Sequence, residues 1–320
     1  MNRTLNNRNG LAPADLAAAI AVTVLLAGVL VPGLSRSRAT AIRLACEANL
    51  TGLGQAMTVY TNENDARFPR AGGPGATWSP DGIILDWIGG RSGTEDRAFG
   101  ITRDPYTGEV VDPGEATITS SFYLLVKYSM VTPKQVVCKG DAGAQEFKIS
   151  YSLYARRIEY DMSRAWDFGE GERLGRTGPQ LPYPGEHVSY SYHMPYSLPY
   201  YMESFVITAE HPAASPVCAD RNPYLDTNAA ALPTDPDEIR SYNCASHLST
   251  GQNVLYKDGH VKFETSPIVG IRGDNIYTCR GSFGEDPSLG TGPADDGDPA
   301  AYPWDQADTL LLGERNGRTR

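Results

Sequence analysis

The sequence is poor in positive charge and lacks the common signatures of catalytic sites. Its 28 Lys and Arg residues face 38 Asp and Glu residues, which leaves a net charge of −10. A chain this acidic repels phosphate backbones, so the composition excludes general nucleic-acid binding. No Gly-x-Ser-x-Gly, His-Glu-x-x-His, phosphate-loop or dinucleotide-binding glycine motif occurs. We therefore expect no catalytic residues and no enzymatic activity.

Glycine and proline are abundant, and charge is unevenly distributed. The 33 glycines and 23 prolines predict many turns and long irregular connections rather than a helical bundle. Residues 1–65 hold five arginines against four acids, so residues 66–320 carry all of the acidic excess. The first part of the chain is thus a different kind of segment from the rest, which is long enough to bury its own core.

A long uncharged stretch near the N-terminus predicts a membrane-spanning helix. Residues 16–34 contain no charged side chain, and as a helix they extend over roughly 28 Å, enough to cross a bilayer core. Apolar residues then recur at three- and four-residue steps, which indicates an amphipathic helix. We expect one helix of about 65 Å from Leu16 to Tyr60, kinked at Pro32. Its amphipathic stripe consists of Ala39, Ile42, Cys46, Leu50, Leu53, Met57 and Tyr60.

Two simpler interpretations of this segment remain open. A cleaved signal peptide fits the basic start and the apolar run, but no Ala-x-Ala cleavage site follows the run. An uncleaved signal anchor fits better, because the helical pattern continues beyond the apolar residues. Flanking charge does not orient the segment well, since the three arginines after it outnumber Arg3 and Arg8 before it.

The N-terminus resembles those of type IV prepilins and type II secretion pseudopilins. Gly10 ends a polar leader, Leu11 begins the next segment and Asp15 lies five positions after the glycine, with Pro32 further along. In that family a prepilin peptidase cleaves after the glycine, and the next residue is N-methylated. The resemblance implies cleavage after Gly10, methylation of Leu11, and assembly roles for Asp15 and Pro32. Asp15 stands where the family usually has Glu, which is one methylene longer.

The resemblance also implies a domain organisation. It divides the chain into a leader at 1–10, a transmembrane half helix at 11–34, an amphipathic half helix at 35–65 and a head at 66–320. Within the head, residue patterns predict a short helix over 121–128, a strand or extended chain over 131–138, and strands at 190–192, 205–207 and 215–218. The expected fold is therefore α+β and pilin-like, with antiparallel sheet and long loops in the head.

The clearest element of the head is a hairpin over residues 253–264. Asp258-Gly259 is a dipeptide typical of a two-residue hairpin turn. Pairing about that turn places Tyr256 opposite Val261 and Val254 opposite Phe263 on one apolar face. The alternation predicts a half-buried antiparallel hairpin.

The same region resembles a bacterial prepilin-like family defined by a His, a nine-residue gap and Asp-Gly. Here ten residues separate His247 from Asp258-Gly259, with His260 next, and the segment around Asp220 is similar to another part of these proteins. Two interpretations stay open for the histidines and Asp258. They form an ordinary structural hairpin, or they join a metal or sugar site, although their spacing matches no zinc motif.

The five cysteines imply disulfides if the head lies outside the cytoplasm. Spacing does not determine the connectivity. Because Cys46 and Cys138 both lie in segments that resemble the family, we expect them to pair first, and Cys218 to pair with Cys244 next. A weak calcium site is conceivable at Asp295, Asp296 and Asp298, but the run lacks EF-hand order. We expect no other metal or cofactor.

The sequence thus favours a non-enzymatic pilin-like or pseudopilin-like subunit of a type II secretion or type IV pilus assembly. The expected partners are a prepilin peptidase, other pilin-like subunits and the inner membrane. The N-terminus would be cytoplasmic, with the head in the periplasm or at the cell surface. The alternative is a monomeric membrane-anchored extracytoplasmic binding protein, for example one that binds glycans.

Overall fold

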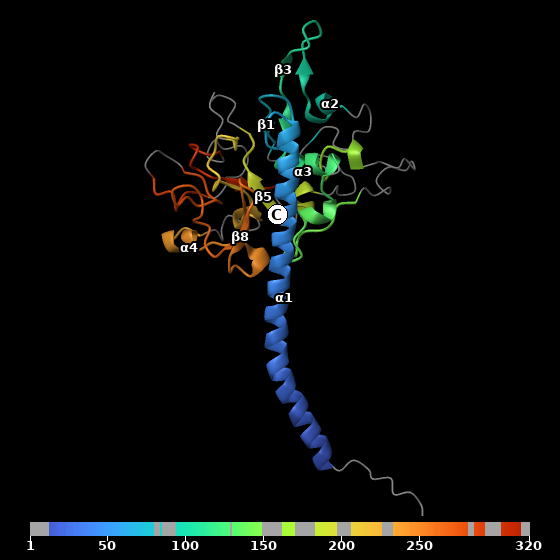
Figure 1. Ribbon diagram of the computed structural model, residues 1–320, viewed down its shortest axis with the longest axis vertical. Helices are drawn as coiled ribbons and strands as arrows, with labels where there is room; N and C mark the ends of the chain where they lie inside the picture. The colour runs from blue at the N-terminus through green and yellow to red at the C-terminus, as the bar shows by residue number, and fades with distance from the viewer. Residues whose placement is uncertain are drawn as a thin grey trace, which may run out of the picture. The chain divides into compact units, whose positions relative to one another are not determined.

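The computed structural model describes residues 13–79, 84, 94–128, 130–148, 162–169, 183–196, 206–225, 233–280, 285–291 and 302–314. The chain divides into two compact units, residues 1–42 and residues 43–320. Helices and sheets are both present, as expected for a mixed α+β protein (Figure 1). Our expectations for Gly10 and Leu11, and for the calcium candidates Asp295, Asp296 and Asp298, lie outside the described residues.

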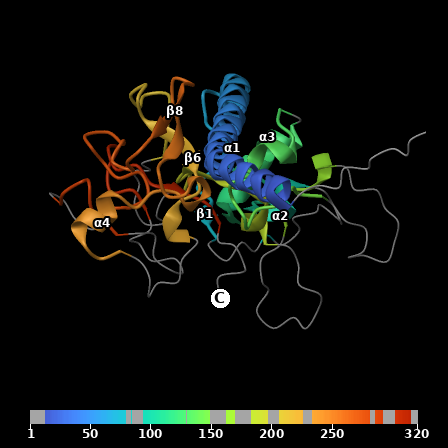
Figure 2. The ribbon, with the colours of Figure 1, turned by 90° about the horizontal axis from the view of Figure 1, so that it is seen from below.

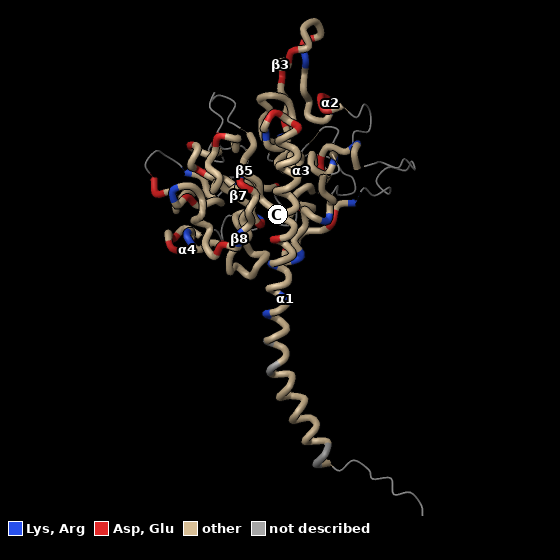
Figure 3. The backbone as a smooth tube through the Cα atoms, in the orientation of Figure 1, with Lys and Arg blue, Asp and Glu red and all other residues tan. Residues whose placement is uncertain are grey.

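One helix, α1 (Pro13–Glu63), contains both the apolar and the amphipathic stretch. It begins and ends within three residues of the expected bounds, and its helical assignment continues through Pro32. No Lys, Arg, Asp or Glu interrupts residues 16–34 (Figure 3). The helix is long and apolar enough to cross a membrane, with a mean hydropathy of 2.4 in its most apolar window, none of which is buried. Its exposed apolar side chains include Leu16, Ile20, Val24, Leu25, Leu30 and Leu34.

A five-stranded antiparallel sheet forms the centre of the unit at residues 43–320. The strand order is β8-β7-β6-β5-β9. The bounds are β5 (Tyr190–His193), β6 (Pro216–Asp220), β7 (Gln252–Tyr256), β8 (Val261–Glu264) and β9 (Leu311–Leu312). Two short pairs lie outside it, β1 (Thr77–Trp78) with β4 (Glu115–Ala116), and β2 (Thr102–Arg103) with β3 (Val110–Asp112).

Short helices connect the strands. They are α2 (Glu95–Phe99), α3 (Ile118–Lys127) and α4 (Pro236–Arg240). Thr117 begins α3 with a capping box, in which its hydroxyl accepts the Ser120 N–H and the Ser120 hydroxyl accepts the Thr117 N–H. The prediction of a strand or extended chain over residues 131–138 is wrong. A 3-10 helix (Pro133–Val136) forms there, because Pro133 fits a first helical turn and Gln135 reaches back to the Thr132 N–H.

The hairpin of β7 and β8 is present, but its expected register is wrong by one residue. Val254 lies opposite Lys262, and Leu255 lies opposite Val261. The Tyr256 N–H donates to the His260 carbonyl, and the Gly259 N–H donates to the Tyr256 carbonyl, so three residues form the loop. Among the turn residues only Gly259 has a positive φ, +89°. A two-residue turn of the expected type needs positive φ at both central positions, whereas a three-residue loop needs it only at the glycine.

Strand β7 is buried on both faces rather than half-buried. Val254 and Tyr256 pack into a core with Ala219, Ile276 and Leu311. On the opposite face, Leu255 lies against α1, where a Cβ on Gly54 would come within 2.8 Å of its Cδ1. Glycine at that position therefore permits the close contact between helix and strand.

From residue 43 onward, α1 lies between the sheet and α3 (Figure 2). Leu50 and Leu53 are completely buried there. The Asn49 amide donates to the Val137 carbonyl and to the Tyr190 hydroxyl, and the Tyr60 ring lies 6.2 Å from the ring of Tyr128 after α3. The amphipathic part of the helix thus supplies a central element of the core, and burial of its stripe stabilises the unit.

Candidate functional site

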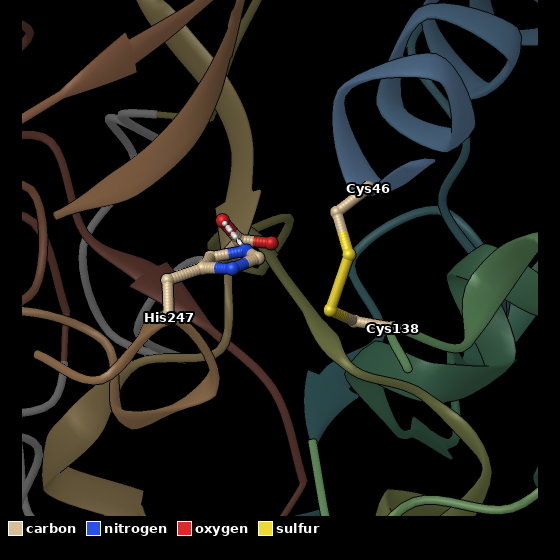
Figure 4. Close-up of side chains that lie close together, drawn as sticks. Cys46, Cys138 and His247 are labelled. Atoms are coloured by element: carbon tan, nitrogen blue, oxygen red, sulfur yellow. Dashed lines mark ion pairs between the residues drawn. A yellow bond between two sulfur atoms is a disulfide. The ribbon is translucent and has the colours of Figure 1, made fainter. Parts of the chain in front are cut away.

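A disulfide joins α1 to the segment that follows the Pro133–Val136 turn. Cys46 and Cys138 lie 92 positions apart in sequence and 5.6 Å apart between Cα atoms (Figure 4). Both side chains are buried. This is the first of the two pairings that the resemblance implied.

The second implied pairing, Cys218 with Cys244, is wrong. Cys218 is a buried free cysteine, and Cys244 is buried as well. Each sulfur instead lies near a local backbone group. The Cys244 sulfur accepts the Ser246 N–H and caps the 3-10 helix Ala245–His247, and the Cys218 thiol points to the Ala219 carbonyl, 4.0 Å away. Each of the two sulfurs thus contacts a backbone group close to it in sequence.

A buried polar network lies beside the disulfide (Figure 4). Asp220, the last residue of β6, has no exposed surface. Its Oδ2 accepts the Asn253 backbone N–H at 2.6 Å and the Asn253 side-chain amide at 3.1 Å, and lies 2.9 Å from His247 Nε2. Its Oδ1 is buried and has no hydrogen-bond partner among the described residues. A buried carboxylate oxygen without a partner raises the free energy of the folded state.

The disulfide and the network together form one cluster. The sulfurs of Cys46 and Cys138, a carboxylate oxygen of Asp220 and a ring nitrogen of His247 all lie within 4.8 Å of one another. All four side chains are buried. They come from α1, the segment after the Pro133–Val136 turn, the end of β6 and the 3-10 helix Ala245–His247. The fold therefore gathers two sulfurs, one imidazole and one carboxylate at a single point.

An aromatic and cationic layer covers part of this cluster. The Arg43 guanidinium carbon lies 4.6 Å from the centre of the Phe263 ring, a cation–π geometry. The same ring lies 6.1 Å from the His247 ring, edge to face. The Asn253 amide also reaches the Arg43 carbonyl at 3.4 Å. Arg43 thus places its guanidinium over the same aromatic ring that contacts His247.

The remaining motif residues lie at the hairpin turn and not in this cluster. The His260 ring nitrogen Nδ1 lies 2.5 Å from Asp258 Oδ1, and the ring stacks on Tyr256 at 4.4 Å. Both side chains are about half exposed, 48% and 45%. Hydrogen bonds from His260 lower the pKa of Asp258. The bond from the backbone N–H has the largest effect, and the bond from the side chain comes next. The structure thus does not bring Asp258 and His260 together with His247 in one site.

A second group of buried charges lies near the C-terminal segment. Arg280 Nε lies 3.5 Å from Asp274 Oδ1 and 3.7 Å from Asp308 Oδ1. Burial raises the pKa of Asp274 to about 8 and that of Asp308 to about 6. Raised carboxylate pKa values are typical of catalytic sites, but also of structural networks. Here the carboxylates accept the backbone N–H groups of Thr309 and Trp304, which gives them a structural role.

A surface groove of about 690 Å³ lies at the C-terminal end of α1. Aromatic and charged side chains line it, so it offers both stacking and hydrogen-bonding groups. They include Tyr60, Glu63, Arg67, Phe68, Arg70 and Tyr192.

Sequence reasoning selected Asp220 and His247 through the resemblance, but it missed three neighbours. Asn253, Arg43 and Phe263 complete the surroundings of the cluster. The sequence signal that could have indicated Asn253 is its polar side chain in a strand whose following residues are apolar. The chain matches no protein-family model, no curated protein and no solved structure. A function must therefore be argued from the residues and the fold.

Proposed function

We propose that this protein is a non-enzymatic pilin-like subunit of a type IV pilus or type II secretion assembly. The apolar part of α1 anchors it in the inner membrane, with the N-terminus in the cytoplasm and the head outside. The observation that carries the proposal is that one helix, α1, has both an exposed apolar part and a part that belongs to the core of the head. The large apolar side chains described within residues 16–34 are exposed, whereas one face of the part that follows is buried in the core of the head, at Cys46, Leu50, Leu53, Met57 and Tyr60. A simple anchor needs only the first property.

The sequence around the leader supports the same proposal. A prepilin peptidase cleaves after Gly10, and Leu11 becomes the methylated first residue. Asp15 then lies at the N-terminal edge of the apolar part of α1, and a carboxylate inside a membrane is costly, about 2.5–3.5 kcal/mol at the bilayer centre on insertion scales. The α-ammonium group of Leu11 on a neighbouring subunit is a cation able to offset that cost. Assembly thus supplies a charge partner for Asp15.

Processing is the first test of this function. Because the leader is removed after Gly10, protein from native membranes should begin at methylated Leu11, ten residues shorter than the precursor. Mass spectrometry of the N-terminal peptide measures this. Gly10→Leu should leave the precursor uncleaved, since the peptidase needs a small residue there. An intact leader on the native protein would instead favour the monomeric anchored binding protein, with the groove at the end of α1 as its binding site.

The second test concerns Asp15. Asp15→Ala should leave membrane insertion unchanged and reduce crosslinking into higher oligomers, because the intersubunit charge pair is lost. Asp15→Glu should assemble at least as well as the original chain, since its carboxylate reaches further. Crosslinking yields in native membranes, compared at equal expression, give the measurement. Equal yields for Asp15→Ala and the original chain would contradict the intersubunit role.

A further inference from the structure

The cluster at Cys46 has the composition of a metal site as well as of a disulfide. Two thiolates, one imidazole and one carboxylate form a complete four-ligand set for Zn²⁺, which binds Cys, His and Asp in tetrahedral geometry. With Zn–S bonds near 2.3 Å and Zn–N or Zn–O bonds near 2.0–2.2 Å, ligand atoms of a tetrahedral site lie roughly 3.3–3.8 Å apart. The four candidate atoms already lie within 4.8 Å of one another. Small side-chain movements are therefore enough to reach zinc-binding distances.

We propose that, when the disulfide is reduced, the two cysteines bind Zn²⁺ together with His247 and Asp220. The disulfide and the zinc ion are then two alternative links between the same segments. A dithiol reductant supplies the two electrons and two protons that convert the disulfide into two thiols, and is itself oxidised to a disulfide. Zinc then displaces both thiol protons, which are released to solvent.

The unpartnered oxygen of Asp220 supports this assignment. Its Oδ2 is occupied by the two Asn253 groups and by His247, whereas no residue that the structure describes donates to the lone pairs of Oδ1. A metal ion is the type of partner that such a buried oxygen accepts. The contacts of Asn253 hold the carboxylate in place, as outer hydrogen bonds orient ligands in zinc sites.

The charge of the occupied site is also compatible with its surroundings. Two thiolates and one carboxylate exceed the charge of Zn²⁺ by one negative unit. The Arg43 guanidinium, held over the Phe263 ring beside His247, provides a nearby positive charge. Within the described part of the chain, its Nε is buried without a hydrogen-bond partner. The site thus has a compensating cation from the same helix that carries Cys46.

Cobalt and zinc binding to the full-length chain tests the proposal, which does not depend on the assembly function. The protein and each variant are purified oxidised in detergent, so that every chain folds with the disulfide in place before reduction. It is then reduced with a phosphine in metal-free buffer and titrated with Co²⁺. We expect thiolate-to-cobalt charge-transfer bands and the intense visible bands of a tetrahedral site, with one metal ion per chain. The oxidised protein should give neither.

Variants separate this site from nonspecific binding to thiols. His247→Gln and Asp220→Asn should weaken zinc binding by at least about 10-fold, and Asn253→Ala by about 10–100-fold, because it orients Asp220. His260→Gln and Cys279→Ala remove a histidine and a thiol outside the cluster, and should bind zinc as tightly as the original chain. Reduced protein that takes up no cobalt, or unchanged affinity in His247→Gln and Asp220→Asn, would overturn the proposal.

Discussion

The double variant Cys46→Ser, Cys138→Ser should lose roughly 4–5 kcal/mol of unfolding free energy in metal-free buffer. The disulfide closes a loop between residues 92 positions apart, and in the chain-entropy model a link over such a loop removes many conformations of the unfolded chain. The loss is a large fraction of the stability of a typical domain. The link also holds α1 against the segment after Pro133–Val136, so its removal should loosen the buried helix.

Guanidinium denaturation in detergent, followed by the fluorescence of Trp78 and Trp166, measures this loss. Cys279→Ala is a suitable control, because it removes a buried sulfur that lies outside the Cys46–Cys138 disulfide. This variant should lower the unfolding free energy only by the cost of a small cavity. If the double variant unfolds at the same guanidinium concentration as the original chain, the disulfide does not stabilise the fold in the expected way.

Asp220→Ala should destabilise the oxidised protein by about 3–5 kcal/mol, since removing one partner from a buried charged network leaves the others without compensation. The backbone N–H and the amide of Asn253 would both lose their 2.6 Å and 3.1 Å contacts to the carboxylate. His247 would lose its carboxylate neighbour as well. Replacement also leaves a cavity under α1, which adds to the cost.

A matched pair on the surface provides the control. Asp258 makes the same kind of contact with His260, but both are about half exposed. Asp258→Ala should therefore cost no more than about 1 kcal/mol. Asp220→Asn keeps an acceptor for Asn253 and should fall between the two alanine variants. If Asp220→Ala and Asp258→Ala lower the unfolding free energy by similar amounts, burial does not determine how much these pairs stabilise the fold.

The sequence predicted the parts of the fold that depend on local pattern. Residues 16–60 form a helix because apolar residues recur at helical spacing and no interior position breaks the pattern completely. The short helix near residue 121 and the strands near residues 190 and 216 also follow local pattern. The strand expected at 205–207 is wrong for its described residues, since 206 and 207 lie outside any strand. The local pattern gave wrong predictions where two backbone conformations differ little in free energy. The hairpin at Asp258-Gly259 takes a three-residue loop, and the segment at Pro133 takes a helical turn instead of a strand.

The candidate site was predictable only in pieces. The resemblance selected Cys46, Cys138, Asp220 and His247, but as members of a staple and of separate motifs. Their meeting at one point depends on how α1 packs against β6 and β7, and no spacing along the chain contains that information. The register of β7 and β8, which places Asn253 opposite Phe263, was likewise set by the turn and by burial on both faces.

The position of the disulfide has a mechanical consequence. Tension between the N-terminal end of α1 and any point after Cys138 passes through the sulfur–sulfur bond, because that is the shortest covalent path. The backbone between Cys46 and Cys138, which includes the buried end of α1 and all of α3, carries none of this load. A pull on the N-terminal end of α1 would thus stretch the chain from residue 138 onward, while the part of α1 after Cys46 bears no tension.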